Sequence, residues 1–256
     1  MPTTLANALQ NDIDDFNAYL LKLDPTRAPA GSIGHVYIPE SVYPLKTKGA
    51  DVGVSGDLIN EGVAGLPVVI PAYSNMQVDD VIKVYWDDDQ VWTHKVRSGQ
   101  QGQPLTLNIP ADDIPAGITE LYFSVTAPSA SVEEQSVRLS VLVRLNYPGE
   151  DPNLDHQLAP ATVSHAKIDL NSKNVQVTVP AYAKMRRYDR IQLSWSGHML
   201  EHEVTSRQVG KAITIDIPDS VVDGSSDANV EISYYVIDEV GNESDDWSPN
   251  TVITND

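Results

Sequence analysis

The chain has 256 residues, 41% hydrophobic and 21% charged, which suffices for one large domain or two ordinary ones, each with a core. Its formal net charge of −19 repels phosphate backbones, so we expect no nucleic-acid partner. The sequence contains no cysteine, which excludes disulfides, thiol catalysis and thiolate metal sites.

The N-terminal segment predicts an amphipathic helix over residues 5–23. Its apolar residues step by three and four and form one stripe: Leu5, Leu9, Ile13, Phe16, Leu20 and Leu23. Thr3 or Thr4 can cap its start, and Pro25 ends it because the residue before a proline avoids the helical conformation. We expect the stripe to pack on the first β domain. Binding of a partner, or targeting for secretion, is the alternative.

The same N-terminus lacks the basic segment and the long apolar run of a Sec signal. No stretch approaches the roughly 18 apolar residues of a transmembrane helix. We therefore expect no membrane span. The protein is predicted to be cytoplasmic, or exported by a route that needs no cleaved N-terminal signal.

Residues 25–50 are interrupted by prolines and glycines, which predicts an extended connector over the first domain, with short edge strands at 36–38 and 42–43. From residue 51 the pattern becomes short alternating apolar stretches separated by turns, which is typical of strands. The clearest stretches are 105–109, 121–125, 137–145, 175–179, 191–195, 213–217 and 230–236. A hairpin turn is expected over 238–244, with Gly241 and Asn242 at positive φ.

One stretch of sequence occurs twice. Residues 68–86 and 177–195 share Pro, Ala, Tyr, Met, Asp and Trp at the same internal spacing. Each half has about the 100 residues of an immunoglobulin-like sandwich. We predict an all-β protein of two tandem immunoglobulin-like β-sandwiches preceded by one N-terminal amphipathic helix. The predicted parts are a helix and connector (1–50), sandwich 1 (51–148), a proline-stiffened linker (149–158) and sandwich 2 (159–256).

The second half carries a more specific pattern. It comprises Ala-Pro-Ala-Thr-Val at 159–163, Val-Thr-Val-Pro-Ala-Tyr-x-x-Met at 177–185, Asp189, Trp195, Ile-x-Ile-Pro at 215–218 and Val-x-Ile-x-Tyr-x-Val at 230–236. This pattern resembles a bacterial Ig-like repeat found in tandem in large surface or adhesin-type proteins, notably of pseudomonads. The resemblance covers 159–256 well and 60–147 less well. Where the family has glycine, this chain has Asp79 and Tyr188. The resemblance implies an Ig-like fold and a scaffold or recognition role, and supplies no catalytic residues.

The residues that suggest chemistry also have structural explanations. The repeated pairs Tyr73/Tyr182, Met76/Met185 and Trp86/Trp195 are expected in the cores and inter-strand turns. His94 and His202 occupy equivalent places, predicted to be polar strand faces one domain apart. His198 and His202 have the spacing of a helical zinc pair, but four strand residues span about 13 Å. We expect no required cofactor.

Calcium is the best inorganic candidate. Acidic side chains gather at three predicted turns: Asp87 to Asp89; Glu150, Asp151 and Asp155; and Asp238, Asn242, Asp245 and Asp246. None of these groups has the EF-hand spacing. An accessory calcium ion and an ordinary solvated turn both remain open.

The predicted binding site is the one basic cluster. Four of the 17 positive charges, Lys184, Arg186, Arg187 and Arg190, lie within seven residues, with Tyr188 among them. The matching loop of the first half, residues 75–80, is neutral to acidic, so the fold does not require this charge. Pairing with nearby carboxylates and a recognition role both remain open.

The leading functional hypothesis is a non-enzymatic, adhesin-like recognition protein. It would bind a protein or a glycan through loops at the ends of its sandwiches. One alternative is a secreted effector or toxin-associated protein that uses these domains for targeting. A second alternative is a hydrolase of unknown class, for which the sequence offers only unassigned carboxylates.

Overall fold

The computed structural model describes residues 2–23, 33–61, 65–130, 132–153, 157–164, 167–168, 174–223 and 229–255. It divides into two compact units, Met1–Leu145 and Asn146–Asp256, called unit 1 and unit 2 below. Among the described helices, none is both long and apolar enough to cross a membrane.

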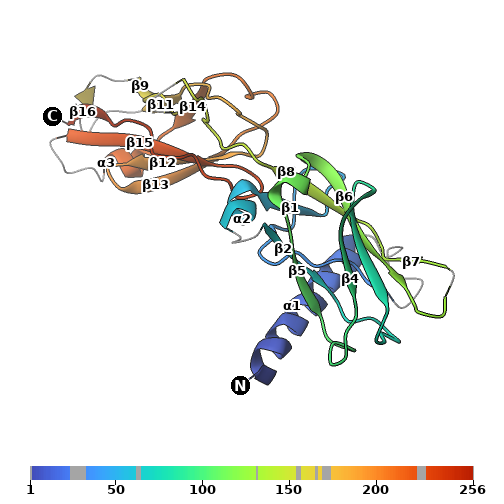
Figure 1. The fold of residues 1–256 in the computed structure, drawn as a ribbon. Helices are drawn as coiled ribbons and strands as arrows, with labels where there is room; N and C mark the ends of the chain where they lie inside the picture. Colours follow the sequence, from blue (N-terminus) through green and yellow to red (C-terminus); the bar gives the residue numbers. More distant parts are fainter. Residues whose placement is uncertain are drawn as a thin grey trace. The chain divides into compact units, whose positions relative to one another are not determined.

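Unit 1 is a β-sandwich preceded by a helix (Figure 1). Its elements are α1 (Pro2–Leu23), β1 (Val52–Ser55), α2 (Gly56–Glu61), β2 (Leu66–Ile70), β3 (Val81–Trp86), β4 (Asp89–Lys95), β5 (Leu105–Ile109), η2 (Ala111–Asp113), β6 (Gly117–Thr126), β7 (Glu134–Gln135) and β8 (Leu139–Arg144). The larger sheet has the order β1-β8-β6-β3-β4, with β7 paired to β6, and the smaller sheet is β2-β5. Strand β1 runs parallel to β8, whereas β6 is antiparallel to both of its neighbours β3 and β8.

The alternating apolar pattern explains which side of each strand is buried. Leu105, Leu107 and Ile109 of β5 point inward, and the residues between them are exposed. Trp86 of β3 is 1% exposed, and its indole N–H donates to Thr119 Oγ1 at 2.9 Å. The two sheets thus enclose one apolar core.

Helix α1 packs the middle of its apolar stripe against this core, as expected, but Leu23 at its end is 50% exposed. Ile13, Phe16 and Leu20 are buried in the same cluster as the strand residues. The Phe16 ring lies 5.3 Å from that of Tyr37 and 5.4 Å from that of Tyr43. The side chains of Thr3, Thr4 and Leu5, and the expected stop at Asp24 and Pro25, lie outside the described residues.

The described part of the connector, residues 33–50, does not form the short strands expected at 36–38 and 42–43. Tyr37 and Val42 each make only one isolated bridge, to Val69 and Gly53. Pro39 and Pro44 follow these bridges and lack the N–H that would extend them.

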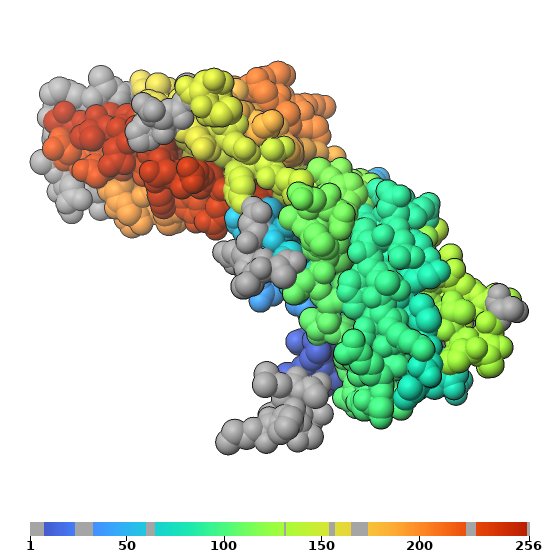
Figure 2. Space-filling view, viewed as in Figure 1, coloured from blue at the N-terminus to red at the C-terminus, as the bar shows by residue number. Residues whose placement is uncertain are grey.

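Unit 2 repeats the sandwich with the strands β9 (Thr162–Val163), β10 (Lys167–Ile168), β11 (Gln176–Val179), β12 (Arg190–Trp195), β13 (His198–Glu203), β14 (Ile213–Asp216), β15 (Asn229–Ile237) and β16 (Thr251–Asn255), and the short helix α3 (Asp219–Asp223). Its larger sheet is β10-β16-β15-β12-β13, and its smaller sheet is β14-β11-β9. The C-terminal residues, red in Figure 2, form part of the surface of this unit.

The two units share one topology. In the larger sheet of each, an early strand runs parallel to the last strand. One antiparallel strand, β6 or β15, then connects the last strand to an edge hairpin, β3–β4 or β12–β13. This is the strand order of an immunoglobulin-like sandwich, so the all-β prediction is confirmed. One detail of the last hairpin differs from expectation. Gly241 has a φ of 99°, but Asn242 has no left-handed φ; its side-chain amide donates to Asp238.

Candidate functional site

The segment 180–190 of unit 2 forms a tight corner in front of β12. Tyr182 donates its phenol O–H to Asp189 Oδ2 at 3.0 Å, and the backbone N–H of Arg186 donates to the same oxygen at 2.7 Å. Asp189 is fully buried. Because both donors converge on one carboxylate oxygen, the corner is held by hydrogen bonds among its own residues.

Unit 1 builds the same corner in front of β3. Tyr73 donates to Asp80 Oδ2 at 2.8 Å, and the N–H of Gln77 donates to it at 3.0 Å. Met76 and Met185 are each 8% exposed in the cores beside these corners. The repeated Tyr and Met residues are therefore structural, as predicted.

The tyrosines of these corners remain hydrogen-bond donors. Burial, followed by the negative charge of Asp189 and the hydrogen bond to it, raises the pKa of Tyr182 far above its ordinary value. Burial, followed by the hydrogen bond to Asp80, raises the pKa of Tyr73 in the same way. Neither phenol is suited to give up its proton near neutral pH.

The corner holds Tyr188 in a left-handed backbone conformation. Its φ is 72°, and the matching Asp79 has a φ of 73°. These are the two positions at which the resembling family has glycine, the residue that adopts this conformation without strain. The Tyr188 N–H donates to Val204 O at 2.9 Å, and the Val204 N–H donates to Asp189 O at 2.8 Å. This pairing fixes the direction in which the Tyr188 side chain leaves the backbone.

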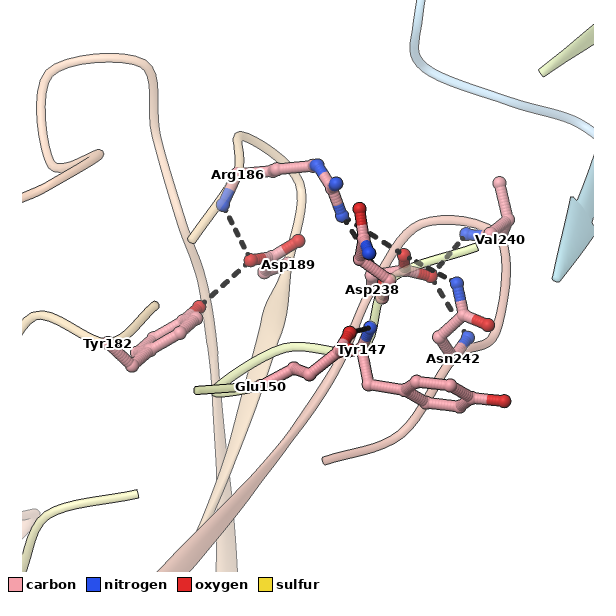
Figure 3. A network of polar contacts seen from close by, with 9 residues as sticks. Tyr147, Glu150, Tyr182, Arg186, Asp189, Asp238, Val240 and Asn242 are labelled. Carbon is pink, nitrogen blue, oxygen red and sulfur yellow. Dashed lines mark hydrogen bonds and ion pairs between the residues drawn. The ribbon is translucent and has the colours of Figure 1, made fainter. Parts of the chain in front are cut away.

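Arg186 turns toward the last hairpin of unit 2 (Figure 3). Its Nη1 lies 3.9 Å from Asp238 Oδ2 and 3.5 Å from the carbonyl oxygen of Asn146. Asp238 is fully buried and also accepts from the N–H groups of Val240 and Asn242 and from the Asn242 amide at 2.9 to 3.0 Å. The Arg186 side chain thus has an intramolecular partner, one of the two roles the sequence left open.

The other predicted site residues are distributed along the corner. Lys184 and Arg187 are exposed, and the Arg187 guanidinium lies 4.2 Å above the centre of the Tyr188 ring. Arg190 is half-buried at the start of β12, opposite Glu203 and Ile237. The structure therefore brings Arg187 and Tyr188 into contact and leaves Lys184 on the same exposed loop.

This basic loop lies beside the first residues of unit 2. The Gly149 N–H donates to the Ala183 carbonyl at 2.8 Å, and the Tyr147 N–H donates to Glu150 Oε2 at 3.0 Å. The loop is thus at the end of the sandwich where the chain enters unit 2.

The histidines lie differently from expectation. His94 of β4 is opposite Ile82, and His202 of β13 is opposite Ile191; directly opposed residues share a face of the sheet. Both imidazoles are therefore half-buried on the core side of an edge strand, not on its polar face. Each Nε2 contacts a glutamine six residues later, at 2.9 Å in unit 1 and 3.0 Å in unit 2.

The acidic turns have protein partners where they are described. Asp88 Oδ1 accepts from Arg138 and from Tyr122, each at 2.9 Å. Asp155 lies outside the described residues. Among the residues that the structure does describe, no three His, Asp or Glu side chains are grouped closely enough to hold a metal ion.

A feature that the sequence analysis did not single out is a polar hollow of about 600 Å³ on unit 2. Its lining includes Ser194, Ser196, Asn229, Glu231, Ser233 and Asn250. These residues come from β12, β15 and the chain around them, so only the pairing of strands brings them together. Comparing the outward-facing strand positions of the two repeats in the sequence would have pointed to this hollow.

The fold and these corners define a protein of tandem immunoglobulin-like sandwiches. No protein-family model and no curated protein matches the sequence. Three solved structures with similar folds are a bacterial ice-binding adhesin of 1.5 MDa, described for host cell surface retention, the D0–D1 domain of intimin, and the adhesin domain of Epf from Streptococcus pyogenes.

These likenesses are distant. The ice-binding adhesin is 12% identical, with a TM-score of 0.34 over 80% of this chain and 60% of its own. The intimin structure is 7% identical, with a TM-score of 0.26 over 79% of this chain and 94% of its own. The Epf structure is 9% identical, with a TM-score of 0.27 over 74% of this chain and 76% of its own. The chain therefore spans less than two thirds of the first of these structures. Similarity of this degree assigns no activity or partner.

Proposed function

We propose that the protein is a non-enzymatic, adhesin-like recognition protein that contacts a protein or glycan partner through the basic loop of unit 2. The observation that carries this proposal is the Arg187–Tyr188 pair, an exposed guanidinium 4.2 Å above a ring whose backbone is fixed. Arginine and tyrosine are both enriched at interface hot spots. A pre-positioned pair loses less conformational entropy when a partner binds.

The electrostatics of the chain support an acidic partner. The formal net charge is −19, and the loop places Lys184 and Arg187 at the surface of this acidic protein. A local positive patch orients an acidic partner, while the remaining surface repels it from other approaches.

The five residues of the predicted site then take different parts. Lys184, Arg187 and Tyr188 would make the contact. Arg186 would position the loop, because its guanidinium is directed at Asp238 and Asn146. Arg190 would anchor the start of β12 opposite Glu203.

Two immobilised acidic probes, heparin and polyglutamate, test the proposal. We expect the protein to be retained at low salt and released as the Debye length falls to a few ångströms. The double variant Lys184→Ser, Arg187→Ser should elute at clearly lower salt than the wild type. Substitution of Asn75 and Val78 by serine, at the matching positions of unit 1, is the matched control and should change nothing.

Thermal melting accompanies each variant, because only a folded variant is informative. Failure of the wild type to bind either probe, or equal retention of the folded double variant, would show that the loop is an ordinary solvated turn.

A further inference from the structure

We propose that the polar hollow on unit 2 is a binding site for a neutral saccharide. The site lies on the outward face of the sheet that contains β12 and β15, and it is separate from the basic loop. It goes beyond the function proposed above, and the two proposals can fail independently.

The geometry of the hollow follows from the strand register. Ser194 of β12 is directly opposite Ser233 of β15. Two short side chains therefore lie side by side on the outward face of the sheet, where larger side chains would fill the space above the strands. Beyond them, the Ser196 N–H donates to the Glu231 carbonyl at 2.8 Å. The Asn250 amide lies 3.4 Å from Glu231 Oε2. Small polar residues therefore form the floor, and Glu231 and Asn250 stand at one side.

Unit 1 fills the same place with large side chains. Tyr85 is opposite Tyr122, as Ser194 is opposite Ser233, and their rings stack at 5.0 Å with an interplanar angle of 10°. Arg138 covers this pair, with its guanidinium 4.2 Å above the Tyr122 ring and Nη1 2.6 Å from Glu120 Oε2.

The correspondence extends to the surrounding bonds. The Asp87 N–H donates to the Glu120 carbonyl at 2.9 Å, as Ser196 does to Glu231. Arg138 contacts Glu120 in unit 1, as Asn250 contacts Glu231 in unit 2. The sandwich thus folds with this face filled. The hollow is a property of the side chains of unit 2 and is not required by the backbone.

The lining selects the chemistry of the ligand. The volume of the hollow, about 600 Å³, falls within the roughly 300–1,000 Å³ of small-molecule sites. Such sites are mostly apolar, whereas this one is lined by serine, glycine, asparagine and glutamate. An apolar ligand would desolvate these groups without replacing their hydrogen bonds. An anion would meet the Glu231 carboxylate on a protein of net charge −19.

A neutral saccharide satisfies both conditions. Its hydroxyl groups donate and accept, as do the serine hydroxyls and asparagine amides that line the hollow. The Glu231 carboxylate can accept charge-assisted hydrogen bonds from sugar hydroxyls.

A partly exposed tryptophan contacts β15, one of the strands that line the hollow. Tyr235 follows Ser233 by two residues on β15, so both side chains lie on the same face. The Trp247 ring lies 4.7 Å from the Tyr235 ring and is 42% exposed. A broad indole with an accessible surface offers the apolar C–H face of a sugar ring a contact that the polar floor cannot give.

The first experiment is an array of neutral oligosaccharides, followed by calorimetric titration of the best one. We expect the full chain to bind neutral sugars. The triple variant Ser194→Tyr, Ser233→Tyr, Asn250→Arg gives unit 2 the side chains of unit 1 and should abolish binding. Trp247→Ala should weaken it about three- to tenfold, the range expected for one aromatic contact.

The control is a surface change away from the hollow. Val209→Ser should leave saccharide binding unchanged, because this exposed residue lines no part of the hollow. If the triple variant melts early, Trp247→Ala remains informative, because its ring is partly exposed. No binding of neutral sugars by the wild type, or unchanged binding by the folded triple variant, would overturn the proposal.

Discussion

Tyr182 and Asp189 are joined by a hydrogen bond of 3.0 Å between the phenol oxygen and Oδ2, inside the core of unit 2. Tyr73 and Asp80 repeat it at 2.8 Å in unit 1. Both bonds close the corner that leads into the inner strand of the edge hairpin, β3 in unit 1 and β12 in unit 2. This relationship accounts for two of the residues that recur in the sequence, and it leads to the first prediction.

Replacing Tyr182 by Phe should destabilise unit 2. The buried Asp189 would lose one of the two donors to its Oδ2, and a hydrogen bond to a charged group contributes about 1.5–3 kcal/mol. Urea unfolding followed by circular dichroism measures the change. Tyr235→Phe is the control, since it keeps the ring beside Trp247 and should stay within about 0.5 kcal/mol of wild type. Equal stability of Tyr182→Phe and Tyr235→Phe would show that the corner bond contributes nothing.

Asp238 and Arg186 should contribute unequally to the stability of unit 2, although their side chains face each other. Asp238→Ala removes the acceptor of three hydrogen-bond donors in the last hairpin and should cost about 2–4 kcal/mol. Arg186→Ala should cost about 1 kcal/mol or less, because its side chain is 31% exposed and 3.9 Å from the carboxylate. Chemical denaturation of the two variants gives both values. If Arg186→Ala lost more stability than Asp238→Ala, the ion pair would contribute more to folding than the hydrogen bonds of the hairpin.

Stability should fall in alkaline solution. Burial raises the pKa of Tyr234 to about 12, and its phenol donates to the Ala159 carbonyl at 2.8 Å. In the unfolded chain a tyrosine titrates near pH 10. Between about pH 10 and 12 the folded state therefore binds more protons, so this contribution to stability is present below pH 10 and is lost as the pH rises through the folded pKa.

Urea midpoints measured from pH 8 to 12, together with tyrosinate absorbance, test this window. The exposed tyrosines should titrate first, and unfolding should accompany the late ones. A midpoint that stays constant to pH 12 would contradict the assignment.

The N-terminal helix should be part of the stable fold of unit 1. Phe16→Ala removes a ring buried among Tyr37, Tyr43 and the core and should cost about 3–5 kcal/mol. Leu21→Ala is the matched control on the same helix, because Leu21 is 39% exposed, and it should cost well under 1 kcal/mol. Similar melting temperatures for the two variants would indicate that α1 docks only weakly.

The sequence by itself determined the class of fold. Strand alternation has a period of two residues and the helical stripe a period near four, so both can be read locally. The repeated Tyr, Asp and Trp residues then indicated two equivalent sandwiches, and their buried positions in the structure explain why they recur. The short strands expected in the connector did not form, because the prolines beside single bridges prevent a ladder.

The tertiary structure decided what the surface residues do. Whether Arg186 faces solvent or the last hairpin depends on Asp238, which lies far away in the sequence. The hollow on unit 2 depends on Ser194 and Ser233 being opposite each other, a fact of strand register between β12 and β15. Local patterns specify which face of a strand is apolar. Which outward side chains become neighbours is settled only when distant strands pair, because that choice rests on long-range hydrogen bonding and packing.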